Sequence, residues 1–191
     1  MINLNSLERF GFQFRKSSVH TARTMMLDDL CLLLNYVSEP HASGEEYLKA
    51  IKDDNCLGKR SVRTRKLSAA HLANLYALDP SVVIFRALRY FWSREEKGQP
   101  LLALLCAYAR DTILRMSAAM ILKQPQGAMI SRAAMGAFID RLYPGRFSKA
   151  TLKSTAQNIN ATWTSSGHLQ GRFPKVRIKV QPTLGAVSYA L

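Results

Sequence analysis

The segment 147–180, FSKATLKSTAQNINATWTSSGHLQGRFPKVRIKV, combines side chains that bind polyanions with a complete lack of Asp and Glu. Lys149 and Lys153 stand four residues apart, and Gln157 and Asn160 follow at helical spacing, so all four share one face of a helix. Lysine donates hydrogen bonds to phosphate or guanine, whereas Gln and Asn form paired hydrogen bonds with adenine. This pattern is typical of a helix that contacts nucleic acid.

The same helix carries a narrow apolar stripe that must face a core. The stripe consists of Leu152, Ala156, Ile159 and Trp163. The remaining side of the helix, with Thr151, Thr155 and Asn158, is polar and uncharged. We therefore expect a helix with one narrow apolar face that packs against a core and a wide polar face exposed to water.

A short basic ribbon follows the helix and supplies further cations. Val176, Ile178 and Val180 alternate with Arg177 and Lys179, which is the two-residue period of a half-buried strand. We expect the apolar set to pack inward and the basic set to meet solvent or phosphate. The cations expected to contact DNA from this ribbon are Arg172, Lys175, Arg177 and Lys179.

The elements around this helix follow one another in an informative order. The residues AMI (128–130) predict a short strand, and Ser131 and Ser148 are N-caps of two helices separated by the turn YPGRF. Gly167 ends the second helix. A strand, two helices and a two-stranded ribbon make up a winged helix-turn-helix, which places its second helix in the major groove and its wing along the backbone or minor groove.

The first two-thirds of the chain have the apolar spacing of helices. We expect helices over 21–37 and 43–54, after an N-cap at Ser68, after Asp79-Pro80, and as one segment from Pro100 to about Leu122. The fold class is therefore mainly α: a helical bundle followed by a winged helix-turn-helix with a small β-wing.

This order divides the chain into three parts. A helical body spans 1–122, either as one unit or with a smaller N-terminal helical subdomain over 1–66. The winged helix-turn-helix covers 128–181, and 182–191 begin a further C-terminal element.

The charge of the chain is strongly one-sided. The 191 residues carry a formal net charge of +14, and eight bases and no acid follow Asp140. Such an excess predicts attraction to a polyanion. A second basic patch contains Lys59, Arg60, Arg63, Arg65 and Lys66. This patch is either a flexible solvated loop or a second phosphate contact that becomes ordered on binding.

Other classes of protein have little support in the sequence. The longest apolar run, 101–109, is far shorter than the roughly 20 residues of a membrane span. The N-terminal residues do not have the pattern of a signal peptide. We therefore expect a cytoplasmic protein without membrane contact. No spacing of His or Cys indicates a metal, and no cofactor motif is present, so we expect no enzyme activity. A metal-dependent nuclease built from adjacent acid pairs such as Asp28/Asp29 is the alternative.

Two segments, LGKRSVRTRKLSAAHLANLYALDPSVVIFRALRYFW (57–92) and FSKATLKSTAQNINATWTSSGHLQGRFPKVR (147–177), resemble the BrxA family of the bacterial BREX phage-defence systems. The resemblance implies a non-enzymatic helical body similar to the antitermination factor NusB, with winged-helix elements that bind double-stranded DNA. It covers most of the chain, although relatives are expected to continue beyond the terminal TLGAVSYAL. The matched positions that carry DNA contacts are Lys149, Lys153, Gln157, Asn160, Arg172, Lys175 and Arg177.

The sequence thus predicts an accessory protein of a BREX-type defence complex that holds double-stranded DNA mainly by its phosphates and contacts other BREX subunits. Two alternatives stay open: an RNA-binding factor similar to antitermination proteins, and a scaffold whose winged helix binds protein. The oligomeric state is left undetermined by the sequence.

Overall fold

A computed structural model describes residues 4–14 and 17–191 of the chain. Helices dominate the described part, which also contains two 3-10 turns and three short strands. In chain order the elements are α1 (Leu4–Phe10), η1 (Val19–Thr21), α2 (Leu27–Tyr36), α3 (Gly44–Lys52), α4 (Val62–Tyr76), α5 (Val83–Trp92), η2 (Glu96–Gly98), α6 (Gln99–Arg110), α7 (Thr112–Leu122), β1 (Met129–Ile130), α8 (Arg132–Leu142), α9 (Lys149–Ser165), β2 (Leu169–Gln170), β3 (Lys175–Arg177) and α10 (Leu184–Ala190).

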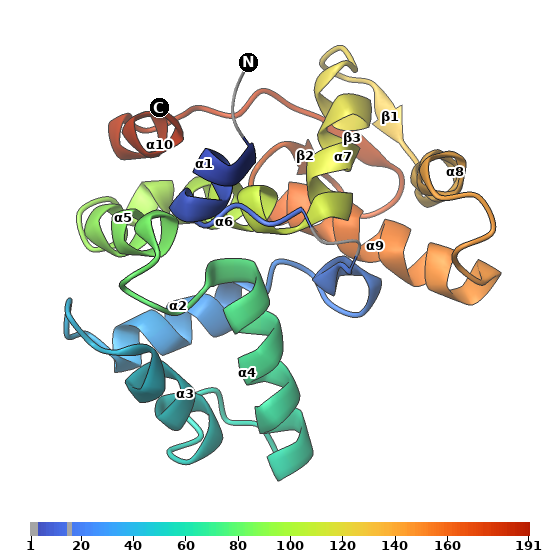
Figure 1. Ribbon diagram of the computed structural model, residues 1–191. Coiled ribbons are helices and arrows are strands. Elements are labelled where there is room, and N and C mark those ends of the chain that lie inside the picture. Colours follow the sequence, from blue (N-terminus) through green and yellow to red (C-terminus); the bar gives the residue numbers. More distant parts are fainter. Residues whose placement is uncertain (1–3, 15–16) are drawn as a thin grey trace.

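The molecule is organised around α6, which lies across its middle and packs against α4, α5, α7, α9 and α10 (Figure 1). Helices α2 to α4 lie below α6 in this view, and α8, α9 and the sheet lie on the right. One hydrophobic core runs through these parts, from Val19 near the N-terminus to Ala186 in α10. The predicted mainly helical fold class is confirmed.

The three strands form one antiparallel sheet with β3 in the centre, in the order β1–β3–β2. Its register pairs Ile130 of β1 with Lys175, and Leu169 of β2 with Arg177. Helices α8 and α9 occupy the chain between β1 and β2. The strand predicted at 128–130 is confirmed, although its hydrogen-bonded part is confined to two residues.

Both serine caps predicted in this region are confirmed. The hydroxyl of Ser131 accepts a hydrogen bond from the Ala134 N–H at the start of α8, and that of Ser148 accepts one from the Thr151 N–H at the start of α9. These caps satisfy amide groups that have no partner inside a helix. Gly167 follows α9 with a positive φ of 79°, as expected of a helix terminator.

The predicted cap at Ser68 is wrong. The cap of α4 lies seven residues earlier, at Ser61, whose hydroxyl accepts a hydrogen bond from the Thr64 N–H. The helix therefore begins at Val62, and Ser68 is buried inside it. The second half of the patch 59–66 is therefore helical, and not a flexible loop.

The single helix predicted from Pro100 to Leu122 is two helices. Asp111 interrupts it with an extended backbone and caps α7 by accepting a hydrogen bond from the Leu114 N–H. Two predicted starts also differ: α2 begins at Leu27 instead of residue 21, and α5 begins at Val83 instead of after Pro80. Before α2, residues 23–26 have no regular secondary structure and Met26 has a positive φ of 54°, whereas residues 80 and 81 before α5 form a turn. Hydrophobic spacing does not reveal either feature.

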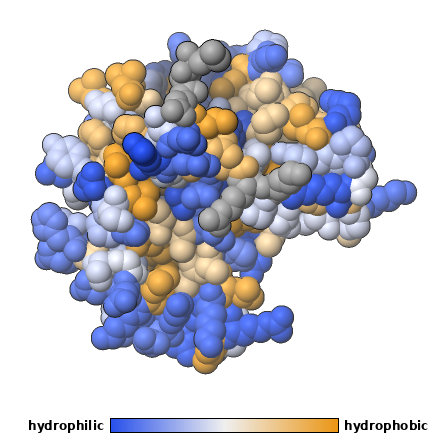
Figure 2. Space-filling view, in the orientation of Figure 1, coloured by the Kyte–Doolittle hydropathy of each residue, from blue (hydrophilic) through white to orange (hydrophobic). Residues whose placement is uncertain are grey.

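The surface separates by polarity in the view of Figure 2. Hydrophilic residues cover the lower part, over α3 and α4, and the outer end of α9, whereas hydrophobic residues gather in the upper half around α10 (Figure 2). Over residues 4–14 and 17–191, no helix reaches the length and hydropathy that crossing a lipid bilayer requires.

Candidate nucleic-acid interface

A groove lies between α8 and α9 and extends to the turn that joins β2 to β3. It has a volume of about 360 Å³ and no carboxylate among its lining residues. Those residues are Arg132, Ala133, Gly136, Ala137, Lys149, Leu152, Lys153 and Phe173. The groove therefore presents only positive charge, beside small and apolar side chains.

Local sequence explains why these side chains meet. The cap at Ser148 places Lys149 in the first turn of α9, with Lys153 one turn further along the same face. The cap at Ser131 likewise places Arg132 in the first turn of α8. A Cβ built on Gly136 would lie 3.9 Å from the Cβ of Ala156, so small residues let the two helices approach closely.

The turn between β2 and β3 contributes an aromatic ring to this groove. Phe173 is 72% exposed and lies in the turn between β2 and β3, which Gly171 enters with a positive φ of 84°. Phe173 and Arg132 were not among the site residues predicted from sequence. The signals were present, since Arg132 follows a helix cap and Phe173 lies within the acid-free turn GRFPK.

Four of the eight DNA contacts predicted from sequence are exposed in suitable positions. Lys149, Lys153 and Gln157 are exposed and form one stripe along α9, each a full turn from the next. Arg172 is exposed beside Phe173 in the turn between β2 and β3. These four residues surround or continue the groove.

The other four do not join this surface. Asn160 is only 4% exposed, and Nζ of Lys175 donates to the Gly171 carbonyl in the turn between β2 and β3. Arg177 donates from Nη1 to the carbonyl oxygens of His168 and Ile178, and Lys179 lines a different cavity.

The predicted orientation of Arg177 in β3 is wrong for a reason that the register makes clear. Directly opposite residues in an antiparallel pair share a face. Lys175 pairs with Ile130 and Arg177 with Leu169, and both apolar partners are buried. Arg177 consequently lies on the face of the sheet that packs inward. A shift of one residue exchanges the two faces of a strand, and the prediction assigned Arg177 to the outer face.

The wide polar face predicted for α9 is also largely covered. Thr155 is fully buried and its hydroxyl donates to the Thr151 carbonyl, while Nδ2 of Asn158 donates to the His20 carbonyl at 3.0 Å. This side of α9 packs against η1, so Lys149, Lys153 and Gln157 form the exposed stripe along the helix, and Ala150 and Ser165 are exposed near its two ends.

The second basic patch is only partly available. Nζ of Lys59 lies 2.7 Å from Oδ1 of Asp29, and Nη1 of Arg65 donates to the Asp53 carbonyl. The remaining three residues, Arg60, Arg63 and Lys66, are exposed. The patch thus supplies fewer free cations than its sequence suggests.

A polar network behind α9 connects three distant parts of the chain. Nε2 of His20 lies 3.0 Å from the Thr162 hydroxyl, and Nδ1 of His20 lies 3.0 Å from Oδ2 of Asp111. This is the connectivity of a hydroxyl–imidazole–carboxylate triad. However, Thr162 and His20 are fully buried, and the Thr162 hydroxyl accepts a hydrogen bond from the Met25 N–H. A substrate cannot reach this hydroxyl, so the network positions the N-terminal segment against α9 and α7.

The carboxylate of Asp111 is unusually well satisfied. The Ser18 hydroxyl and the Val19 and Leu114 N–H groups all donate to it. Burial acts to raise the pKa of Asp111, but His20 and these hydrogen bonds outweigh burial and hold that pKa at about 2. Asp111 is therefore ionised at neutral pH.

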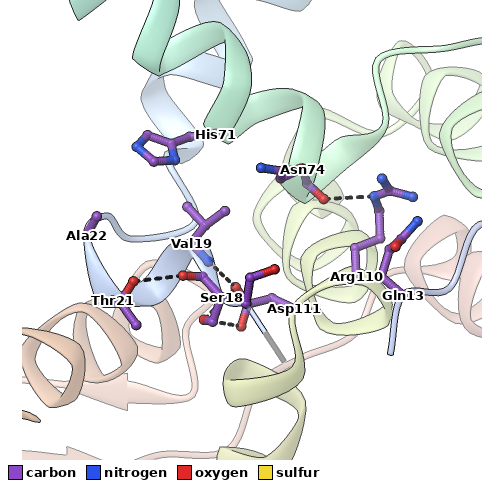
Figure 3. A pocket seen from close by; sticks show the side chains of 10 residues that line it. Gln13, Ser18, Val19, Thr21, Ala22, His71, Asn74, Arg110 and Asp111 are labelled. Carbon is purple, nitrogen blue, oxygen red and sulfur yellow. Dashed lines mark hydrogen bonds between the residues drawn. The ribbon is translucent and has the colours of Figure 1, made fainter. Parts of the chain in front are cut away.

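A polar cavity of about 230 Å³ adjoins this network, and Figure 3 shows its lining. Side chains from η1, the end of α4 and the junction of α6 with α7 converge there (Figure 3). Arg110 is engaged by the protein itself, since its guanidinium donates to the carbonyl oxygens of Gly11, Ala73 and Asn74. The charged side chains of this lining, Arg110 and Asp111, therefore already have protein partners.

Among the described residues, no group of three or more His, Cys, Asp or Glu side chains has a geometry that could hold a metal ion. Comparison with protein-family models and with curated protein sequences finds no match for the chain.

Proposed function

We propose that the protein binds double-stranded DNA through the groove between α8 and α9. The observation that carries this proposal is the meeting of Arg132, Lys149 and Lys153 with Phe173 in one groove that no carboxylate lines. The chain order β1–α8–α9–β2–β3 and the sheet order β1–β3–β2 support a winged helix-turn-helix with α9 as its recognition helix.

In this proposal the N-terminal half of α9 enters the major groove. Lys149, Lys153 and Arg132 bind phosphates, and Gln157 lies one turn further along, where a side chain meets base edges. Arg172 of the wing binds a phosphate of the adjacent backbone. Four such cations predict a slope of about −3 to −4 in log affinity against log salt.

The biological setting follows from the resemblance to the BrxA family. We propose that the protein is a non-enzymatic, cytoplasmic accessory subunit of a BREX-type phage-defence complex, with a helical body similar to NusB and with other BREX subunits as partners. Binding that depends mainly on phosphates suits this role, because defence proteins must act on DNA of many sequences.

The test is the affinity of the full chain for several unrelated duplexes, measured by fluorescence anisotropy across a salt series. The double variant Lys149→Glu/Lys153→Glu should lose at least 100-fold in affinity. The matched control, Lys97→Glu/Lys123→Glu, changes the net charge equally at two exposed lysines outside the groove and should lose far less. Equal losses of affinity in the two variants would show that only the net charge matters, and would contradict the assignment of the groove as the DNA-binding site.

The same assay separates the alternatives. The deep, narrow major groove of duplex RNA does not admit a helix, so duplex RNA should compete poorly with DNA at matched salt. Tighter binding of RNA hairpins than of duplex DNA would instead favour the RNA-binding alternative. A protein partner retained at high salt after nuclease treatment, with no affinity for either nucleic acid, would favour the scaffold.

A further inference from the structure

A second cavity lies on the other side of the wing, under the C-terminal segment. Its volume is about 430 Å³, and its walls come from α6, the end of α7, α9, β3 and α10. Most of its lining is apolar: Leu101, Leu104, Leu105, Tyr108, Leu122, Trp163, Val180, Pro182, Ala186, Val187 and Ala190. Cavities of this size and character hold small organic ligands in many proteins.

The polar part of the lining is exclusively basic or neutral. Arg177 and Lys179 line the cavity with His168, and no carboxylate does. Within the part of the chain that the structure describes, neither cation forms an ion pair. Nε of Arg177 is buried and lacks a hydrogen-bond partner among the described residues, although Nη1 of the same guanidinium is bound to two carbonyl oxygens.

His168 adds no charge to the cavity at neutral pH. Burial, and then the nearby charge of Arg177, lower the pKa of His168 to about 4. Its Nδ1 lies 2.9 Å from the Ser166 hydroxyl, and its ring meets Trp163 edge-on with centroids 4.9 Å apart. The neutral imidazole thus belongs to the apolar wall, and the positive charge is concentrated at Arg177 and Lys179.

We propose that this cavity binds a small amphipathic organic anion. The apolar chain or ring of the ligand lies against the leucines of α6 and the inner side of α10, and its carboxylate or sulfonate meets Arg177 and Lys179. Charge complementarity selects this class, because a half-buried guanidinium without a counter-ion is stabilised by an anion, and a neutral ligand leaves it unpaired.

The site would also connect to the wing. Arg177 ends β3 and pairs with Leu169 of β2, and the turn between these strands carries Phe173. A ligand held by Arg177 therefore contacts the strand that positions the wing tip. This second step rests on the proposed DNA binding, whereas the binding of the anion does not.

The binding step is tested by calorimetry on the full chain, with three probes of equal chain length below their micelle-forming concentrations. Decanoate should bind at one site per chain and at least 10-fold more tightly than decanol, and decyltrimethylammonium should not bind. Equal affinities for decanoate and decanol, or binding of several equivalents of decanoate, would overturn the proposal.

Two variants locate the site. Lys179→Met removes an exposed charge and should weaken decanoate about 10-fold without changing decanol, whereas the control Lys175→Met should change neither. Val187→Trp fills the cavity from α10 and should weaken both probes. Unchanged decanoate affinity in both Lys179→Met and Val187→Trp would show that the anion binds elsewhere.

The link to the wing has a separate readout. Saturating decanoate should change duplex affinity in the wild type and leave it unchanged in Val187→Trp. If decanoate binds as described but duplex affinity never responds, the anion site stands and the connection to the wing is wrong. If the chain does not bind DNA at all, the calorimetric result is unaffected.

Discussion

Nδ1 of His20 lies 3.0 Å from Oδ2 of Asp111, and the two side chains are 0% and 2% exposed. The pair joins η1, close to the N-terminus, to the first residue before α7. Because the Thr162 hydroxyl lies on the other side of the imidazole, α9 is tied into the same arrangement. The helix with the exposed lysines is thus positioned by residues that lie far from it in sequence.

The first prediction concerns acid. The pKa of Asp111 is about 2 in the folded protein and ordinarily 3.8, so its ionisation stabilises the fold above pH 4, and this contribution is lost as the pH falls towards 2. The difference corresponds to roughly 2 kcal/mol. Urea unfolding of the wild type and Asp111→Asn should show a gap in stability that is full at pH 5 and shrinks between pH 4 and pH 2. A constant gap across this range would contradict the prediction.

The second prediction concerns the hydroxyl at the centre of the network. Thr162→Val keeps the shape of the side chain but leaves the Met25 N–H and Nε2 of His20 without a partner. The expected cost is about 1–3 kcal/mol of unfolding free energy. Thr164→Val is the matched control, because the Thr164 hydroxyl bonds only to the Asn160 carbonyl of its own helix. Equal costs for the two variants would argue against a special role for the network.

The third prediction separates two kinds of contact in the groove. Arg132→Gln removes one phosphate contact and should reduce the magnitude of the salt slope by about 1. Phe173→Ala removes an exposed apolar contact and should weaken duplex binding several-fold while leaving the salt slope unchanged. Anisotropy titrations at four salt concentrations measure both quantities. A change of slope in Phe173→Ala would mean that this ring orders a phosphate-binding residue instead.

The fourth prediction tests the start of α4. Ser61→Ala should lower the unfolding free energy by about 1 kcal/mol, because it removes the hydroxyl that accepts from the Thr64 N–H. Ser165→Ala, at an exposed position near the end of α9, should change it by much less. The melting temperatures of the two variants make the comparison. An unchanged melting temperature in Ser61→Ala would show that the first turn of α4 does not contribute to the stability of the fold.

The features of α9 that sequence predicted correctly are local ones. The cap at Ser148 and the apolar stripe ending at Trp163 depend on neighbours within one or two turns, and both are confirmed. The prediction that the polar side of α9 is exposed is wrong, because a segment distant in the sequence packs against it: the carbonyl that accepts from Asn158 belongs to His20. A helical wheel cannot reveal a partner that lies across the fold.

Strand β3 shows a different limit of prediction from sequence. Alternation predicted a strand over 176–180, whereas β3 covers Lys175–Arg177, and alternation alone does not decide which of the two faces of a strand is buried. That choice depends on Ile130 and Leu169, the buried partners of Lys175 and Arg177 in β1 and β2. Likewise, a continuous apolar pattern hid the break at Asp111, whose carboxylate is held by Ser18 and Val19.

The packing of η1 against α9 has a practical consequence for dissecting the protein. A fragment limited to 128–181 would contain every residue of the basic groove. It would nevertheless lack η1, which packs against the side of α9 that carries Thr155 and Asn158. A buried side of its longest helix would then be exposed to solvent. We expect this fragment to aggregate or unfold. A failure of the fragment to bind DNA would therefore not count against DNA binding by the intact chain.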